Sequence, residues 1–366
     1  MSLLKALLKH VVEEHGTLTQ EQGCSAVREI LEGEATDVQI AALLTAIAQR
    51  GPTVEELAGF VQAMRAMSVP LPLTAAERDQ LVDTCGTGSD GHGTFNISTA
   101  AALVGAAAGV KIAKHGNRGV TSKCGSADVL EALGIPVALE PERAVECLRQ
   151  TGFMFLYAPA MHPAMKRVQP VRRALGFRTI FNLAGPLANP AGARAQVIGV
   201  FAGLDLVAQS LARLGVRHAF VVRGRDGLDE LTLNGVTDIA EVREHTVHHF
   251  TLEAADAGLA QAPLSALAGC DAAGNAALIE RILHGEPGPS RDVVLLNAAA
   301  ALLIAGLASD FPGAVRYAAD AIDSGAGLRL LAQLREFAGQ ENTREIRAKA
   351  SAEALETAPP GRQKAT

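Results

Sequence analysis

The sequence predicts an α/β fold, in which a small N-terminal helical domain precedes a larger α/β domain with a central, mostly parallel sheet. Three observations predict it. The first ~70 residues carry only helical spacing and helix caps. Beyond them, short apolar segments alternate with helical ones, as in a sheet built from strand–helix units. The length of 366 residues also suits two domains, at roughly 100–200 residues per domain.

The helical domain begins with apolar residues at helical spacing between Leu4 and Val12. Capping boxes, in which a threonine N-cap is followed three residues later by Gln or Glu, predict three further helix starts: Thr19 with Gln22, Thr36 with Gln39, and Thr53 with Glu56. Gly51 ends one of these helices, and Pro70 follows another. We therefore expect the helical domain to span residues 1–72.

The α/β domain begins where this pattern changes. The segments "QLVDTCGTG" and "VKIAKHGNRG" are typical of strands running into loops, and "STAAALVGAAAG" and "SADVLEALG" after them are typical of helices. A region rich in Pro and Gly over 159–190 contains at least one short helix. Further strands are predicted in "AQVIGVFAG", "HAFVVRGRDGLDELTL" and "DIAEVRE", with helices near 203–214, 275–285, 292–307 and 312–338. We expect this domain to cover 73–340, and residues 341–366 to form a charged tail that frays or docks loosely.

Composition disfavours several classes of protein. A net charge of −6 and a pI of about 6.0 disfavour a general binder of nucleic acid or of anionic membranes. With no Trp and only 2 Tyr, platforms for stacking single-stranded bases are scarce. Lys5, Lys9 and His10 interrupt the apolar N-terminus, which we interpret as an amphipathic helix and not a signal peptide. No stretch approaches the ~18–20 uncharged apolar residues of a membrane span.

The cysteines are odd in number, far apart and without C-x-x-C spacing: Cys24, Cys85, Cys124, Cys147 and Cys270. This pattern predicts thiols in a reducing compartment and no zinc site. We therefore expect a cytoplasmic protein.

The stretch "DTCGTGSDGHGTFNIST", from Asp83 to Thr99, contains the pattern G-x-G-x-x-G. A dinucleotide loop would start its helix within the glycines and place an acid about 20 residues further on. Here the helix begins near Ser98, and Lys114 stands at that distance instead of an acid. The glycines expose backbone N–H groups, and polar residues at a helix start favour an anion. The loop therefore predicts phosphate binding, with a capped strand–helix turn as the simpler alternative.

A second polar loop, "KHGNRGVTSKCGSADVLEALG", follows the next predicted strand. Its cations and hydroxyls again precede a helix: Lys114, Arg118, Thr121, Ser122, Lys123 and Ser126. The carboxyl ends of neighbouring parallel strands meet at one edge of a sheet, so the two loops would face one crevice. The pair favours a ligand with more than one phosphate group over a plain solvated basic loop.

The segment "GRDGLDELTL" supplies three acids, Asp226, Asp229 and Glu230. Adjacent carboxylates on a regular strand point to opposite faces, but in a turn they can converge on a hard cation. Magnesium usually binds through one or two carboxylates together with substrate phosphates. Alone, the segment fits a hairpin with exposed acids better, but the phosphate loops make the metal site more attractive.

The segment "HPAMKRVQPVRR" carries Arg172 and Arg173. A guanidinium can hold a carboxylate through a forked pair of hydrogen bonds. His162, before Pro163, fits either a helix cap or a substrate contact. Surface arginines and a capping histidine are the plainer interpretation of this spacing alone.

These four motifs, taken in order, resemble those of the anthranilate phosphoribosyltransferase family, and the resemblance runs to about residue 338. It implies transfer of the phosphoribosyl group of 5-phosphoribosyl 1-diphosphate to the amine of anthranilate in tryptophan biosynthesis, with release of diphosphate. It also implies a homodimer, two Mg²⁺ ions, and a helical domain joined by part of 160–185. The α/β domain would be like that of pyrimidine nucleoside phosphorylases. Association with a glutamine amidotransferase partner stays open.

The resemblance assigns a large set of residues to the sugar diphosphate: Gly86, Ser89, Asp90, Thr94, Asn96, Ile97, Ser98, Thr99, Lys114, His115, Gly116, Asn117, Arg118, Gly119, Val120, Thr121, Ser122 and Ser126. It assigns Gly86, Asn117, Arg172 and His162 to anthranilate, and Ser98, Asp229 and Glu230 to magnesium. Two roles stay open for Asp90: a magnesium ion can offset its repulsion of the diphosphate, or it can accept a hydrogen bond from a ribose hydroxyl. The amine is neutral at pH 7, so no single catalytic base is expected.

Some positions depart from the family's usual residues. Ser89 replaces a usual Gly, and Gly119, Thr121 and Cys124 stand where Ser is frequent. None of these departures removes a charged group, so the expected activity is unchanged.

Two other functions remain as alternatives. A pyrimidine nucleoside phosphorylase of the same fold would need no magnesium site for diphosphate, and the pair Asn117–Arg118 and the segment around Arg172 argue against it. A non-enzymatic relative that binds nucleic acid is disfavoured by the net charge of −6. It is also disfavoured by the presence of Ser98, Asp229 and Glu230.

Overall fold

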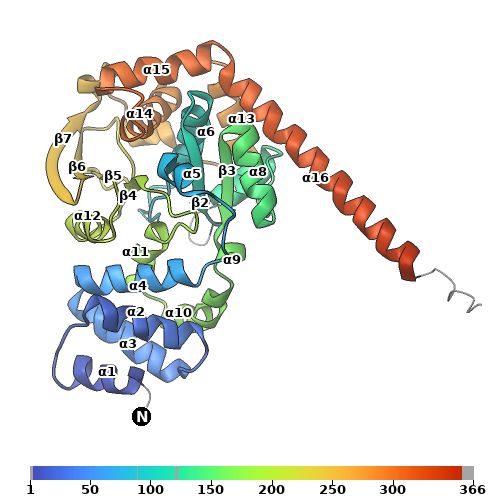
Figure 1. Cartoon of the computed structure of the whole chain (residues 1–366). Coiled ribbons are helices and arrows are strands. Elements are labelled where there is room, and N and C mark those ends of the chain that lie inside the picture. Colours follow the sequence, from blue (N-terminus) through green and yellow to red (C-terminus); the bar gives the residue numbers. More distant parts are fainter. Residues whose placement is uncertain (1–2, 89, 120–122, 357–366) are drawn as a thin grey trace, which may run out of the picture.

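The computed structural model describes residues 3–88, 90–119 and 123–356, and of 342–356 it describes only the backbone. The helices of the N-terminal region form a layer beneath a larger body that is built on a single sheet (Figure 1). Ser89, Val120, Thr121 and Ser122, which the sequence assigns to the sugar diphosphate, lie outside the described residues.

The helical domain combines four N-terminal helices with a segment that returns from later in the chain: α1 (Leu3–Val12), α2 (Gln20–Leu31), α3 (Asp37–Arg50), α4 (Val54–Ala66), the 3-10 helix η1 (Pro163–Arg167) and α10 (Gln169–Leu175). The three predicted capping boxes are confirmed, because each threonine accepts the N3 amide and each N3 side chain returns to the N-cap amide. A fourth box, Thr74 with Glu77, starts α5 (Ala75–Gln80). Val168 and Val171 pack into the core of this domain, and α10 contacts α3.

The sheet has the strand order β3-β2-β1-β4-β5-β6-β7. Its strands are β1 (Leu81–Asp83), β2 (Lys111–Gly116), β3 (Phe153–Tyr157), β4 (Ala195–Gly199), β5 (His218–Gly224), β6 (Val236–Arg243) and β7 (Thr246–Glu253). The strands from β3 to β5 are parallel, whereas β6 and β7 pair antiparallel at one edge. The structure therefore confirms the predicted mostly parallel sheet.

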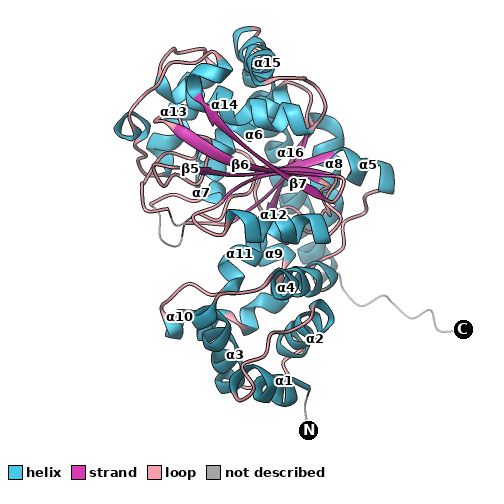
Figure 2. Cartoon of the chain, turned by 90° about the vertical axis from the view of Figure 1, so that its left-hand side faces the viewer, coloured by secondary structure: helices cyan, strands magenta, loops and turns pink. Residues whose placement is uncertain are grey.

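Helices cover both faces of the sheet (Figure 2). The remaining helices are α6 (Ile97–Ala107), α7 (Ser126–Ala132), α8 (Pro141–Thr151), α9 (Ala158–Met161), α11 (Ile180–Leu187), α12 (Leu204–Arg213), η2 (Ala254–Ala257), η3 (Leu264–Leu267), α13 (Ala272–Leu283), α14 (Pro289–Ile304), α15 (Phe311–Asp323) and α16 (Ala326–Glu356). Val82 and Val197 face a core with α6 and α14, whereas Ile198 and Val221 share a core with the helical domain. The strand alternation therefore gives each face its own set of neighbours.

Near the C-terminus, the structure differs from the predicted elements. The segment predicted as one helix over 312–338 is two helices, because the chain turns at Gly325, whose φ is +73°. The second of them, α16, continues to Glu356, and its C-terminal part projects away from the body (Figure 1). The predicted boundary at residue 340 therefore falls inside a continuous helix. Across the part of the chain that the structure describes, no helix is both long and apolar enough to cross a bilayer.

Candidate active site

Strand alternation sends neighbouring polar residues of β2 to opposite faces of the sheet. In the register of β1 and β2, Val82 lies beside Ile112, so Lys114 continues the face that packs on α6. His115 points to the other face, towards Gly185 of α11. We call the region of α10 and α11, residues 169–187, the hinge, because it joins the helical domain to the sheet. Two adjacent residues therefore serve two different regions of the site.

The glycine loop after β1 is fixed against the end of β4. The Thr87 N–H donates to the Gly199 carbonyl at 2.8 Å, and the Thr87 hydroxyl accepts the Phe201 N–H at 3.0 Å. A Cβ on Gly86 would lie 3.3 Å from the Gly199 carbonyl oxygen and 3.4 Å from Asp229 Oδ2. A glycine at position 86 therefore lets this loop approach the loop that carries Asp229 and Glu230, which we call the acid loop. Asp90 closes the tip of the loop, since its Oδ1 accepts the His92 N–H at 3.2 Å.

Lys114 connects the first two loops with the acid loop. Its Nζ donates to the Thr84 carbonyl at 2.8 Å and to Ser98 Oγ at 3.4 Å, and the side chain is buried. The Ser98 N–H, in the first turn of α6, donates to Glu230 Oε1 at 3.2 Å. The structure thus brings Lys114, Ser98 and Glu230 together from three separate segments.

Asp229 and Glu230 form a pair of acids, of which Asp229 is buried and Glu230 is half-buried. Burial raises the pKa of Asp229 well above its ordinary value, and the charges of Glu230 and Asp90 raise it further. Burial also raises the pKa of Glu230 to about 7, although Lys114 opposes this shift. A bound cation would lower the pKa of both carboxyls, because its charge would offset the repulsion between them.

The donor set at this position fits magnesium. Within the described ranges, the protein brings together no group of three or more His, Cys, Asp or Glu side chains that could hold a metal ion by itself. A site with fewer protein ligands therefore has to be completed by other oxygen atoms. Two carboxylates and the Ser98 hydroxyl suit an ion that completes its coordination with waters and with the phosphates of its substrate. Gly199 makes this arrangement possible, because a Cβ there would lie 1.5 Å from the Asp229 carbonyl oxygen.

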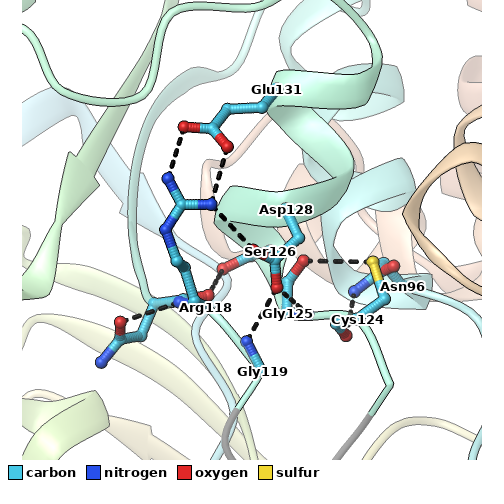
Figure 3. Close-up of polar contacts among 9 residues, drawn as sticks. Asn96, Arg118, Gly119, Cys124, Gly125, Ser126, Asp128 and Glu131 are labelled. Carbon is cyan, nitrogen blue, oxygen red and sulfur yellow. Dashed lines mark hydrogen bonds and ion pairs between the residues drawn. The ribbon is translucent and has the colours of Figure 1, made fainter.

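The second loop is shaped by the start of α7 (Figure 3). Asp128 Oδ2 accepts the N–H groups of Gly119 and Gly125, both at 2.9 Å. Arg118, which the sequence assigns to the sugar diphosphate, instead pairs with Asp128 at 3.0 Å and with Glu131 at 2.6 Å. Its side chain is 47% exposed, so it can exchange these partners for a ligand.

Asn96 holds the loops together from within. Its Nδ2 donates to the Cys124 carbonyl at 3.2 Å (Figure 3), and its Oδ1 accepts from Asn275 Nδ2 at 2.9 Å. Thr94 forms an isolated bridge with Ala268. These two residues of the predicted phosphate site therefore tie the loops to α13 and to the segment before it.

Of the predicted acceptor residues, Arg172 and His162 lie in the segment that returns to the helical domain, whereas Gly86 and Asn117 lie in the loops after β1 and β2. Burial lowers the pKa of Arg172, whose guanidinium carbon lies 5.8 Å from the centre of the Phe181 ring. The rings of His115 and His162 meet edge to face, with centres 5.2 Å apart. Burial lowers the pKa of His115 to about 3 and that of His162 to about 4. Both rings are therefore neutral at pH 7. His162 is buried at the N-cap position of η1, and its side chain makes no capping hydrogen bond.

Sequence reasoning assigned no role to Asp83, the last residue of β1. Asp83 is fully buried, and its Oδ1 accepts the His115 N–H at 3.1 Å. Burial raises its pKa to about 6, against the opposing charge of Lys114. The signal was present in the sequence, as a carboxylate that ends an otherwise apolar strand.

Both domains match known families. Residues 2–68 match the family described as "Glycosyl transferase family, helical bundle domain", and residues 78–328 match "Glycosyl transferase family, a/b domain". The chain is 52% identical over 340 residues to the anthranilate phosphoribosyltransferase of Solibacter usitatus, an alignment that covers 92% of this chain and 99% of that protein.

Solved structures agree with this match. The anthranilate phosphoribosyltransferase of Thermus thermophilus superposes with a TM-score of 0.85 at 41% identity, covering 92% of this chain and 99% of the other. The Saccharomyces cerevisiae enzyme, solved in complex with PRPP and Mg, superposes with a TM-score of 0.81 at 28% identity, covering 92% and 98%. This chain belongs to the anthranilate phosphoribosyltransferase family of glycosyltransferases.

Proposed function

We propose that this protein transfers the phosphoribosyl group of 5-phosphoribosyl 1-diphosphate to the amine of anthranilate, releasing diphosphate, in tryptophan biosynthesis. The observation that carries the proposal is the meeting of Lys114, Ser98 and Glu230, with Asp229 beside the glycine loop. This arrangement supplies a cation, a helix start and a metal-binding acid pair at one edge of the sheet. Each of them suits the diphosphate of such a donor.

The bond that breaks joins the anomeric carbon of the ribose to the diphosphate. The transition state carries oxocarbenium character, as in glycoside chemistry, and negative charge grows on the leaving diphosphate. Lys114 and the N-terminus of α6 stabilise that charge. Magnesium, when bound, neutralises a further part of it. We propose that Ser98, Asp229 and Glu230 hold magnesium, and that two ions bind; the yeast relative solved with PRPP and Mg supports the use of this metal.

Anthranilate would bind at the hinge. Arg172 can take both oxygens of the carboxylate through its planar fork and so aim the amine at the anomeric carbon. The rings of His115 and His162, which contact each other, are neutral and add no positive charge to this region. The nucleophile is already neutral, so positioning supplies much of the rate and no single base is required.

We also propose a homodimer in the cytoplasm. The homodimer is what the family resemblance implies, and three exposed apolar side chains of the helical domain, Leu3, Val12 and Val38, are candidates for the contact. All five cysteines are thiols, which fits a reducing compartment. The net charge of −6 supports the absence of a nucleic-acid partner.

The proposal is tested by the fluorescence of anthranilate. Adding the sugar diphosphate and magnesium to the enzyme should remove that fluorescence with time, and omitting any one component should prevent the loss. A protein that instead cleaves a pyrimidine nucleoside with phosphate, and leaves anthranilate untouched, would be the nucleoside phosphorylase. Salt-dependent retardation of DNA in a gel, without turnover, would support the nucleic-acid-binding alternative.

A further inference from the structure

One arginine of the helical domain, Arg65, contacts the end of α11, the helix that also carries Phe181 beside Arg172. Arg65, near the end of α4, donates from Nε at 2.9 Å and from Nη2 at 2.6 Å to the Leu187 carbonyl, at the C-terminus of α11. The last carbonyls of a helix have no partner within the helix, so this contact fixes the end of α11.

The end of α11 is also fixed to the sheet. Asn189 is buried, and its Nδ2 donates to the Ala113 carbonyl of β2 at 2.8 Å. Two residues further along β2, the His115 N–H is held by Asp83. The segment from Leu187 to Asn189 therefore joins the helical domain to the strand that leads into the second phosphate loop.

The other end of α11 supports the predicted acceptor residue. Phe181 packs on Phe60 of α4, with ring centres 5.3 Å apart, and it also contacts the Arg172 guanidinium, 5.8 Å from the ring centre. One short helix thus carries the platform under Arg172 at its start and the link to β2 at its end. Burial lowers the pKa of Arg65 to about 10, and the charge of Asp83 opposes this shift, which places that cation close to the end of β1.

We propose that Arg65 is a positioning residue for the acceptor: by fixing the C-terminus of α11, it sets Arg172 and Phe181 at the working distance from the loops that hold the sugar diphosphate. This inference rests on the proposed function. It places the main effect of Arg65 on the acceptor, because its hydrogen bonds go to the C-terminus of α11, the helix that carries Phe181 under Arg172.

The test compares Arg65→Ala with Arg213→Ala. Arg213 of α12 also contacts the helical domain, through Gln20 at 2.6 Å and Glu55 at 3.7 Å, and these contacts lie away from α11. Displacement of a reacting group by about 1 Å can cost about 100-fold in rate. We expect Arg65→Ala to lower kcat/KM for anthranilate by about 10- to 100-fold, through kcat as well as KM, with the affinity for the sugar diphosphate and magnesium unchanged. Arg65→Lys, which keeps the charge but loses the fork, should recover part of the loss, and Arg213→Ala should stay within about twofold of wild type.

A second readout does not depend on turnover. Amide hydrogen exchange should accelerate in the peptides that cover α11 in Arg65→Ala, and not in Arg213→Ala. Equal effects of the two variants, or a loss of affinity for the sugar diphosphate with the kinetics for anthranilate unchanged, would overturn the positioning role. Unchanged exchange in α11 would do the same. Wild-type turnover tests the proposed function separately, so an inactive wild type with altered exchange in Arg65→Ala would reject the reaction and retain the link. If Arg65→Ala does not fold, Arg65→Lys carries the same comparison.

Discussion

Two regions of the site differ in the sign of the charge that they hold: the loops at the carboxyl ends of the parallel strands, and the hinge. In the loops, Asp229 and Glu230 are carboxyls whose pKa burial has raised. At the hinge, burial lowers the pKa of Arg172, His115 and His162. The first region places two acids beside one cation, Lys114, whereas the second holds a half-buried cation, Arg172, over an aromatic ring.

This difference in charge fits a different proposed ligand in each region. A magnesium ion with a diphosphate relieves the repulsion between the acids and brings its own oxygen ligands. A carboxylate relieves the desolvation of Arg172. The two ligands are therefore not interchangeable, and variants at one end should leave the other end intact.

The largest effect is expected at the acid pair. Changing Asp229→Asn together with Glu230→Gln should lower turnover by about 100-fold or more, because a metal ion stabilises a developing charge by several kcal/mol. The magnesium concentration needed for half-maximal rate should rise. Steady-state rates over a magnesium series measure both quantities. Asp238→Asn, a surface acid paired with Arg225, serves as the control. An unchanged magnesium response in the double variant would remove both acids from the metal site.

Arg172 should give the next largest effect. A charged hydrogen bond of this kind is worth about 1.5–3 kcal/mol, so Arg172→Ala should lower kcat/KM for anthranilate by about 10- to 150-fold. Arg172→Lys should restore only part of it, because a point charge cannot form the fork. Arg173→Ala is the matched control, since Arg173 is the exposed neighbour. Damage from Arg173→Ala alone would mean that the neighbouring arginine binds the carboxylate.

The dependence of stability on pH should show a smaller effect, which comes from the acid pair. The pKa of Glu230 is about 7 in the folded protein against an ordinary 4.5. The contribution of this carboxyl to the stability of the metal-free fold is therefore fully present below pH 4.5 and is lost as the pH rises to about 7. The proposed magnesium site needs both carboxyls deprotonated, so its affinity should fall below about pH 7 by up to about tenfold per pH unit for each proton displaced. Melting temperatures of metal-free protein, measured against pH, should decline less steeply for Glu230→Gln than for wild type. Identical slopes would exclude Glu230 as the titrating group.

The smallest effect concerns the loop that carries Arg118. Glu131 holds Arg118 away from a ligand through an ion pair whose side chains are 47% and 43% exposed. Exposed pairs contribute little, so Glu131→Ala should tighten the affinity for the sugar diphosphate by no more than about fivefold. Calorimetric titration measures it. Weaker binding in this variant would show that the pair shapes the loop and does not restrain Arg118.

The sequence predicted local features well, because local physics decides them. The capping boxes at Thr19, Thr36 and Thr53 need only residues three apart, and all three formed. The convergence of Ser98 with Glu230 was predicted only through the family, because 132 residues separate them and no periodicity reports that distance. Arg65 and Asn189 gave no signal, since their partners are backbone carbonyls, which every residue type carries. The pairing of Arg118 with α7 also escaped prediction, because a cation in a polar loop suits either a ligand or a nearby acid.

The most direct test of the two-ended site is a calorimetric titration of the sugar diphosphate with magnesium into wild type, Arg172→Ala and the double variant Asp229→Asn/Glu230→Gln. We predict that Arg172→Ala binds within about twofold of wild type, because its charge serves the acceptor, and that the acid variant loses at least about tenfold in affinity. Loss of binding in Arg172→Ala, with binding retained in the acid variant, would contradict the division of the site into these two ends.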